Sequence, residues 1–144
     1  LSCSDKKQGF WNQYEESLKN KDYQNAILNL DNIISEDSNS DFGAKAQYSK
    51  GNLYQSYVHN YDLAIKEYDK VIKNYPNSIY VSDAHFLKCF ILNNNVQKYT
   101  DAIICYEEFI SNYPDSNFID DAQSELKELS GQKTVIDSLI NNNK

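Results

Sequence analysis

The chain has 144 residues, of which 40% are hydrophobic and 24% charged, and its formal net charge is −7. These values describe one folded domain that is large enough to bury a core, and they exclude a disordered tail. Every basic residue is a lysine. The acidic balance argues against binding to nucleic acid or to an anionic lipid surface, because both require clustered cations.

The chain opens with a short polar segment, residues 1–8, which we expect to be a tether. Helical periodicity follows, because Phe10, Tyr14 and Leu18 recur every four residues and so share one helix face. Polar turns separate the later helical segments, and prolines end two of them. After the first helix, the expected helices cover residues 23–34, 42–58, 62–74, 79–93, 100–112 and 118–130, with Asn77 and Ser78 as the expected cap of the helix at 79–93.

Gly131 is the expected end of the helix at 118–130, because glycine readily adopts the left-handed conformation that closes many helices. The remaining residues, 131–144, are expected to form a separate capping helix and a tail. The apolar residues of this helix would share one face and cover the last exposed apolar surface. They are Val135, Ile136, Leu139 and Ile140.

A repeat of 38 residues relates the helical segments. Residues 61–84 and 99–122 are identical at 11 of 24 positions, and residues 23–46 follow the same register. A period of 20–50 residues is typical of solenoids, in which each unit buries its apolar face only against its neighbours. The sequence therefore predicts an all-α solenoid of antiparallel helix pairs, with about 3.5 repeats in residues 9–130.

The repeated positions resemble the tetratricopeptide pattern. The first helix of a pair carries a small residue and an aromatic residue, Gly51 and Tyr54, and the second carries Ala64 and Tyr68 before Pro76 ends it. Packing explains these choices. Gly51 is small because the two helices of a pair cross closely there, and Tyr68 fills the space between successive pairs.

A longer phrase, N-Y-P-[ND]-S-x-[YF]-[VI]-x-D-A, occurs at residues 74–84 and again at 112–122. It resembles tetratricopeptide proteins of the bacterial envelope, and two families are similar over about residues 10–130. The BamD family of outer-membrane lipoproteins implies a role in the assembly of β-barrel proteins. The YbgF family implies a periplasmic partner of the Tol-Pal system. BamD proteins generally carry about five repeats, so this chain would be a shortened member or another lipoprotein that uses the same repeat.

Cys3 follows Leu1 and Ser2 in a pattern similar to the end of a lipoprotein signal, where a small residue precedes the acylated cysteine. Because the chain contains no methionine, we expect Leu1 and Ser2 to be remnants of a signal and Cys3 to be the lipidated N-terminus. Several acyl chains on one cysteine anchor a protein firmly. The alternative is an unmodified surface cysteine in a tail.

The two other cysteines lie in the last complete helix pair. Cys89 takes the small-residue position and is expected to be a buried thiol. Cys105 is expected to face outward, so a disulfide between the two is not favoured. Together with His59 and His85 they lack the spacing of a zinc site, and we expect neither a metal nor a cofactor.

Sequence motifs for catalysis are absent. The chain has no glycine-rich phosphate loop, no nucleophile elbow and no H-E-x-x-H motif. Adjacent carboxylates such as those of Glu107 and Glu108 point in different directions on a helix. We therefore expect no catalytic residues and a protein that is not an enzyme.

In the tetratricopeptide family the first helix of each pair lines a concave groove, and the resemblance implies that partners bind there. Aromatic side chains would anchor a peptide or helix, and amides between them would hydrogen-bond its backbone. The alternative is that some of these aromatic residues are core shared between pairs. The groove residues are Phe10, Tyr14, Tyr48, Asn52, Gln55, Phe86, Phe90 and Asn93.

The leading hypothesis is a lipid-anchored scaffold on the periplasmic face of a bacterial outer membrane, similar to BamD. Its main partner would be a barrel-assembly protein, and we expect it to bind neither nucleic acid nor a small-molecule substrate. One alternative is a YbgF-like periplasmic adaptor, which would form oligomers and carry no acyl chain. Another is a pilot lipoprotein that binds the C-terminal peptide of a secretin or pilus subunit.

Overall fold

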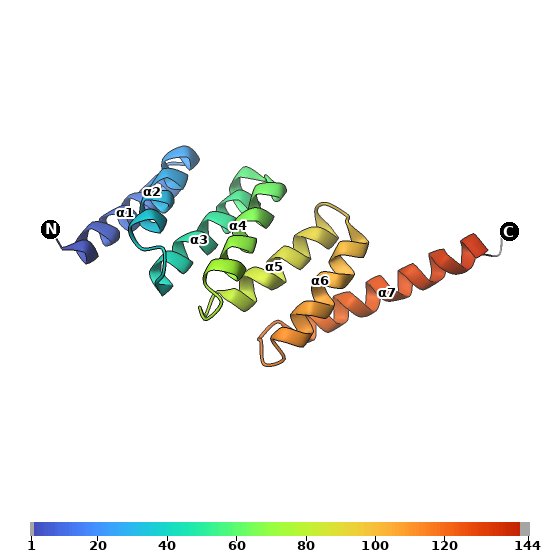
Figure 1. The fold of residues 1–144 in the computed structure, drawn as a ribbon. Helices are drawn as coiled ribbons and strands as arrows, with labels where there is room; N and C mark the ends of the chain where they lie inside the picture. Colours follow the sequence, from blue (N-terminus) through green and yellow to red (C-terminus); the bar gives the residue numbers. More distant parts are fainter. Residues whose placement is uncertain (1, 142–144) are drawn as a thin grey trace. The chain divides into compact units, whose positions relative to one another are not determined.

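The computed structural model describes residues 2–141, although the side chains of residues 3, 4, 135–137 and 139–141 lie outside the description. All regular structure in this range is helical and no strand occurs (Figure 1). Successive helices pack in pairs, so the predicted all-α, tetratricopeptide-like fold is confirmed. The helices are α1 (Cys3–Lys19), α2 (Tyr23–Glu36), α3 (Asp41–Leu53), a π-helical turn (Tyr54–Val58), α4 (Tyr61–Asn74), α5 (Val81–Asn94), α6 (Tyr99–Asn112) and α7 (Ile119–Asn141).

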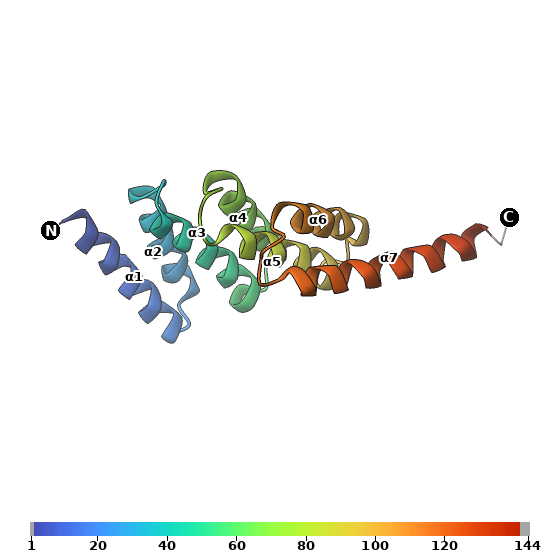
Figure 2. The same cartoon turned by 90° about the horizontal axis from the view of Figure 1, so that it is seen from below.

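Two compact units divide the chain. Unit 1 is Leu1–Ala84 and unit 2 is His85–Lys144, so the boundary falls within α5. In unit 1, α1 packs on α2, α2 on α3, and α3 on α4. Figure 2 shows these four helices side by side in chain order. In unit 2, α6 packs on α7.

Polar side chains start the helices where the sequence has its turns. The Asp22 carboxylate accepts a hydrogen bond from the backbone N–H of Asn25, and Asn60 does the same for Leu63. The Ser40 hydroxyl accepts from two N–H groups at the start of α3. These caps satisfy amides that have no partner within the helix, which fixes the starting point of each helix.

A left-handed residue recurs in the turn inside each helix pair. Lys21, His59 and Gln97 have φ values of 57°, 56° and 56°, and they lie 38 residues apart. None of them is glycine, so composition gives no warning of this conformation. The repeat is therefore a repeat of backbone geometry as well as of packing residues.

The close helix crossing predicted at Gly51 is present in unit 1. A Cβ atom on Gly51 would lie 2.5 Å from Cε1 of Tyr68, which is closer than real atoms approach. The Tyr68 side chain is fully buried, and its hydroxyl lies 2.6 Å from Oδ1 of Asn52 and 2.7 Å from Oε1 of Gln55. Tyr68 thus fills its space as expected and also ties two amides of the preceding segment to α4.

In unit 2 the tyrosine equivalent to Tyr68 is Tyr106, and its hydroxyl has a different environment. Tyr106 and Phe109 of α6 are fully buried, and Ala122 of α7 is too. The hydroxyl of Tyr106 is buried with no hydrogen-bond partner among the described residues. Leu129 is the last buried side chain that the described part of α7 contains.

Residues 1–8 differ from the expected tether, because α1 begins at Cys3. Ser2 caps this helix by accepting a hydrogen bond from the Asp5 N–H. Lys6 forms an ion pair with Glu36 at 2.5 Å, and Lys7 pairs with Asp37. The lysines of the polar segment therefore hold the first turns of α1 against the end of α2.

Gly131 does not end a helix, contrary to the prediction. It lies inside the continuous α7 and does not have a positive φ. A Cβ at Gly131 would meet nothing within 4 Å, so no packing contact forces the chain to turn there. One glycine costs a helix only about 1 kcal/mol, which good helix-forming neighbours offset. The predicted capping residues Val135, Ile136, Leu139 and Ile140 lie outside the described side chains.

None of the helices in the described range combines the length and apolar character that crossing a membrane requires.

Candidate functional site

The predicted groove residues all lie on the first helix of a pair or directly after it. Those of unit 1 are on α1, on α3 and in the π-helical turn, and those of unit 2 are on α5. Tyr14 is 9% exposed and Phe86 is 7% exposed, so both rings belong largely to the core. The other six are partly exposed: Phe10, Tyr48, Asn52, Gln55, Phe90 and Asn93.

Two of the groove aromatics sit in stacked pairs that follow the repeat. The ring of Tyr48 stacks on that of Tyr80 in unit 1, with centroids 5.4 Å apart and planes inclined by 29°. The ring of Phe86 stacks on that of Phe118 in unit 2, at 4.5 Å and 8°. Each pair joins the same two repeat positions. These two predicted groove residues therefore contribute to packing within the fold.

Tyr80 and Phe118 were not among the predicted groove residues. Their signal was present, since they are the [YF] position of the repeated phrase. The equivalent residue one repeat earlier is Phe42, whose ring lies 5.7 Å from that of Trp11. An aromatic residue recurs at this position in all three repeats, but its partner differs in the first one, because Trp11 is one position after Phe10, the equivalent of Tyr48.

The amides of the groove already make hydrogen bonds within the chain. Asn52 and Gln55 bond the Tyr68 hydroxyl, as described above. In unit 2, the Nδ2 of Asn93 donates to Oε2 of Glu125 at 2.7 Å. Burial raises the pKa of Tyr48, while a hydrogen bond from Asn52 acts in the opposite direction. These amides are therefore held in place by hydrogen bonds within the chain.

Trp11 of α1 packs against residues of its own helix and against Phe42 and Lys45 of α3. Its indole Nε1 donates to Oε1 of Glu15 at 2.9 Å, and Nζ of Lys45 lies 3.8 Å above the ring centroid. The ring also lies 5.0 Å from that of Tyr14. A cation over an indole face is favourable, because the ring face is electron-rich.

A buried ionic network lies between α2, α3 and α4 in unit 1. Glu67 is 4% exposed, accepts a hydrogen bond from Gln47, and has Nζ of Lys50 at 3.8 Å and Nζ of Lys70 at 2.9 Å. Lys50 also pairs with Asp31 at 2.6 Å. Burial alone would lower the pKa of Lys50, but the hydrogen bond to Asp31 and the charge of Glu67 outweigh it, so the pKa is raised.

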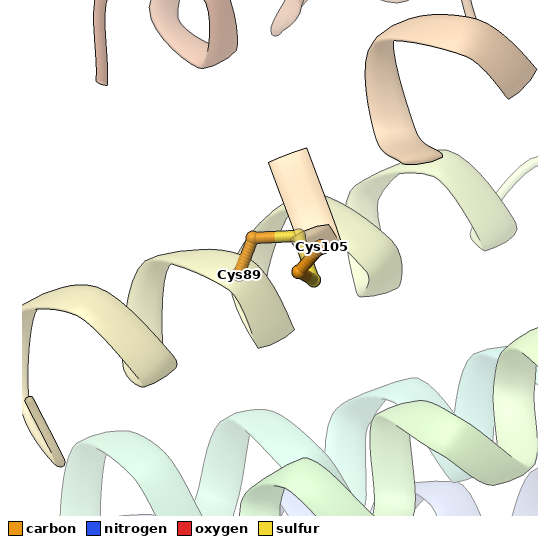
Figure 3. The surroundings of a disulfide bond; sticks show 2 residues. All are labelled: Cys89 and Cys105. Atoms are coloured by element: carbon orange, nitrogen blue, oxygen red, sulfur yellow. A yellow bond between two sulfur atoms is a disulfide. The ribbon is translucent and has the colours of Figure 1, made fainter. Parts of the chain in front are cut away.

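The corresponding place in unit 2 holds a disulfide, which corrects two predictions. Cys89 of α5 and Cys105 of α6 are bonded, with their Cα atoms 5.4 Å apart (Figure 3). Cys105 is 4% exposed and does not face outward. The error has a physical reason. Adjacent Cys105 and Tyr106 both belong to the wide buried face of α6, just as Glu67 and Tyr68 do on α4.

His85 joins the two cysteines, although sequence spacing gave no such indication. One ligand atom from each of His85, Cys89 and Cys105 lies within 4.8 Å of the others, and all three residues are buried. The His85 ring also packs edge-on against the rings of Phe109 and Tyr113. The spacing of cysteines and histidines in the sequence did not reveal this cluster, because Cys105 comes from the next helix. The other histidine, His59, is exposed in a turn and takes no part in it.

Comparison with known proteins adds the family. No curated protein is significantly similar to the chain. Residues 4–132 match the YfiO family, described as outer membrane lipoprotein. This range covers all seven α-helices at least in part, including both copies of the repeated phrase. The chain therefore belongs to the YfiO family of BamD-like, tetratricopeptide-type outer membrane lipoproteins.

Proposed function

We propose that this protein is a non-catalytic scaffold, lipid-anchored on the periplasmic face of a bacterial outer membrane, that helps β-barrel proteins assemble there. The observation that carries the proposal is the family match over residues 4–132, most of the chain. The helical-repeat fold supports it, because such folds present extended surfaces to other proteins.

The partner would be a protein of the barrel-assembly machinery. It would bind α1 and α3 of unit 1, α5 of unit 2, or both sets of helices. Partly exposed aromatic residues on these helices, such as Tyr48 and Phe90, supply apolar anchors. The fixed amides of Asn52 and Asn93 supply polar complementarity. Interfaces of this kind derive most of their affinity from a few aromatic residues.

The anchor would be acyl chains on Cys3. The support is the Leu1-Ser2-Cys3 pattern together with the lipoprotein character of the family. The side chain of Cys3 lies outside the described side chains. The remaining segment, 131–144, would act as a cap on the last helix pair, on the ground that its apolar residues Val135, Ile136, Leu139 and Ile140 recur at helical spacing.

Affinity purification from gently solubilised native membranes, with mass spectrometry of what is recovered, tests the partner. We expect a barrel-assembly protein in the eluate, and its loss when Tyr48→Ala and Phe90→Ala are combined. The matched control combines Leu28→Ala and Ile104→Ala, which remove apolar side chains of 56% and 50% exposure from the second helices α2 and α6.

The control variant should retain the partner. Recovery of Tol-Pal or secretin components in place of barrel-assembly proteins would overturn the assembly role. Equal loss in both double variants would overturn the placement on the first helices. Metabolic labelling with a radioactive fatty acid tests the anchor separately, since Cys3→Ser should abolish the label.

A further inference from the structure

We propose that, once the Cys89–Cys105 disulfide is reduced, His85, Cys89 and Cys105 together bind a zinc ion. The proposal concerns unit 2 alone and does not depend on the partner or the anchor proposed above. It rests on the geometry of the three side chains, on the same positions in unit 1, and on a cavity that reaches Cys105.

The three donors converge from two helices. His85 and Cys89 are four residues apart on α5 and so share one helix face, and Cys105 approaches from α6. Their donor atoms lie within 4.8 Å of one another, which is within reach of one shared ion. Exposure is 5% for His85, 0% for Cys89 and 4% for Cys105, so the site excludes most solvent.

Unit 1 shows that the repeat brings these positions into bonding contact. The residues 38 positions before His85 and Cys105 are Gln47 and Glu67, and the Gln47 side chain donates a hydrogen bond to the Glu67 carboxylate. The side chains at these two positions can thus meet across the first and second helices of one pair. Unit 2 replaces this pair with an imidazole and a sulfur.

The donor set suits zinc in both softness and charge. Two thiolates and a neutral imidazole are ligands that zinc accepts, with a fourth position left for water. Two negative sulfurs and one divalent cation sum to zero, so the buried site carries no net charge. The sulfurs must separate to about 3.8 Å to sit at zinc–sulfur distances of about 2.3 Å, which side-chain rotation allows.

A cavity of about 270 Å³ gives access to Cys105. Its other walls come from α5 and α6, and they carry two acidic residues, Asp101 and Glu108, and one basic residue, Lys88. A bound metal requires such access, because the cysteines themselves are buried. The cavity residues are Lys88, Leu92, Asp101, Ile104, Cys105 and Glu108.

The chemistry balances with a dithiol as reductant. The dithiol gives up two electrons and two protons and becomes a disulfide, while the bond between Cys89 and Cys105 breaks and each sulfur takes one proton. Zinc binding then releases these two protons, because the metal ligand is the thiolate. Cys89 and Cys105 can therefore either form the disulfide or bind zinc, but not both at once.

The test uses the full chain with Cys3→Ser, reduced, so that Cys89 and Cys105 are the only thiols. Cobalt(II) serves as the probe, because cobalt–thiolate bonds give a charge-transfer absorption band. We expect one cobalt per chain, displaced by zinc, and no binding by the oxidised protein. Circular dichroism of each sample checks that the helices are retained.

Two matched histidine variants decide the role of His85. His85→Gln introduces the residue found at the same position of the preceding repeat, Gln47, so the helix packing should survive. It should weaken cobalt binding by at least about tenfold, the lower range seen even for residues that only support a ligand. His59→Gln likewise introduces the residue of the next repeat, Gln97, and should leave binding unchanged.

Absence of the thiolate band in the reduced protein would overturn the proposal. So would equal affinity in the His85→Gln variant and its parent, because the imidazole would then not be a ligand. Equal binding by the oxidised protein would place the metal elsewhere on the chain and would overturn it as well.

Discussion

The repeat position of Glu67 holds the centre of an ionic network in unit 1 and one half of a disulfide in unit 2. Gly51 and Glu67 in the first become Cys89 and Cys105 in the second, 38 residues later. In unit 1 the helices are joined by Glu67 with Gln47, Lys50 and Lys70 around it. In unit 2 a covalent bond joins them.

This difference shows that the repeat fixes where the helices meet but not the chemistry that joins them. A buried carboxylate is sensitive to the removal of its partners, because an uncompensated charge is left in a poorly solvated place. A disulfide is sensitive to reduction instead. The two units should therefore respond to different perturbations, and the following changes test this.

Removal of the buried carboxylate should have the largest effect. Glu67→Ala leaves a cavity and removes the acceptor of the buried Gln47 amide, while Lys50 keeps Asp31 as its partner. We expect a loss of about 4 kcal/mol in the free energy of unfolding, within the range for large-to-small substitutions at buried positions. Urea denaturation measures the loss. Glu107→Ala, which removes an exposed carboxylate from α6, should change stability by less than about 0.5 kcal/mol. Similar losses in both variants would show that the network does not stabilise unit 1.

Removal of the disulfide should come next and should act on unit 2. The bond closes a loop with a sequence separation of 16, for which chain entropy predicts about 3 kcal/mol. Cys89→Ala with Cys105→Ala should raise hydrogen exchange in α5 and α6, measured by mass spectrometry, more than in α2 and α3. Cys3→Ser is the control and should leave exchange unchanged. Uniform acceleration across both units would contradict the local role.

The two equivalent tyrosines should respond differently to loss of the hydroxyl. Tyr68→Phe removes the one hydroxyl hydrogen that Asn52 and Gln55 share as acceptors, so we expect a cost of about 1 kcal/mol. Tyr106→Phe removes a buried hydroxyl that has no partner among the described residues, and should be neutral or slightly stabilising. Thermal unfolding of the pair measures the difference. A larger cost at Tyr106 would reverse the comparison.

Acid should produce the smallest effect, through Asp37 at the end of α2. The hydrogen bonds from Lys7 and Ser40 hold the pKa of this carboxyl below its usual value of 3.8. The stabilisation is therefore complete above about pH 4 and is lost as the pH falls through the lowered pKa. Asp37→Asn should flatten the pH dependence of unfolding below pH 4, by less than about 1 kcal/mol because the pair is partly exposed. An unchanged acid profile would exclude the pair as a contributor.

The features that could be predicted from sequence are those in which every repeat uses the same packing. Gly51 and Tyr68 were identified because a close crossing demands a small residue and a gap demands a ring, wherever the repeat occurs. The assignment of groove residues to first helices followed from the same register.

The features that sequence missed depend on contacts between helices at positions where the repeats differ. Position 67 is a glutamate and position 105 is a cysteine, so no periodic signal marked either as buried. Lys6 and Lys7 looked like a solvated tether, because their partners Glu36 and Asp37 lie thirty residues away. Gly131 was misassigned because a local stop signal is weak where nothing packs against the chain.

The left-handed turn residues have a consequence for the energy of every helix pair. This backbone conformation costs roughly 1–2 kcal/mol for a residue with a side chain and almost nothing for glycine. Lys21, His59 and Gln97 therefore store strain at the same phase of each repeat. Each of the three turns is therefore less stable than it would be with glycine. Replacing these three residues by glycine would remove the strain without changing the path of the backbone.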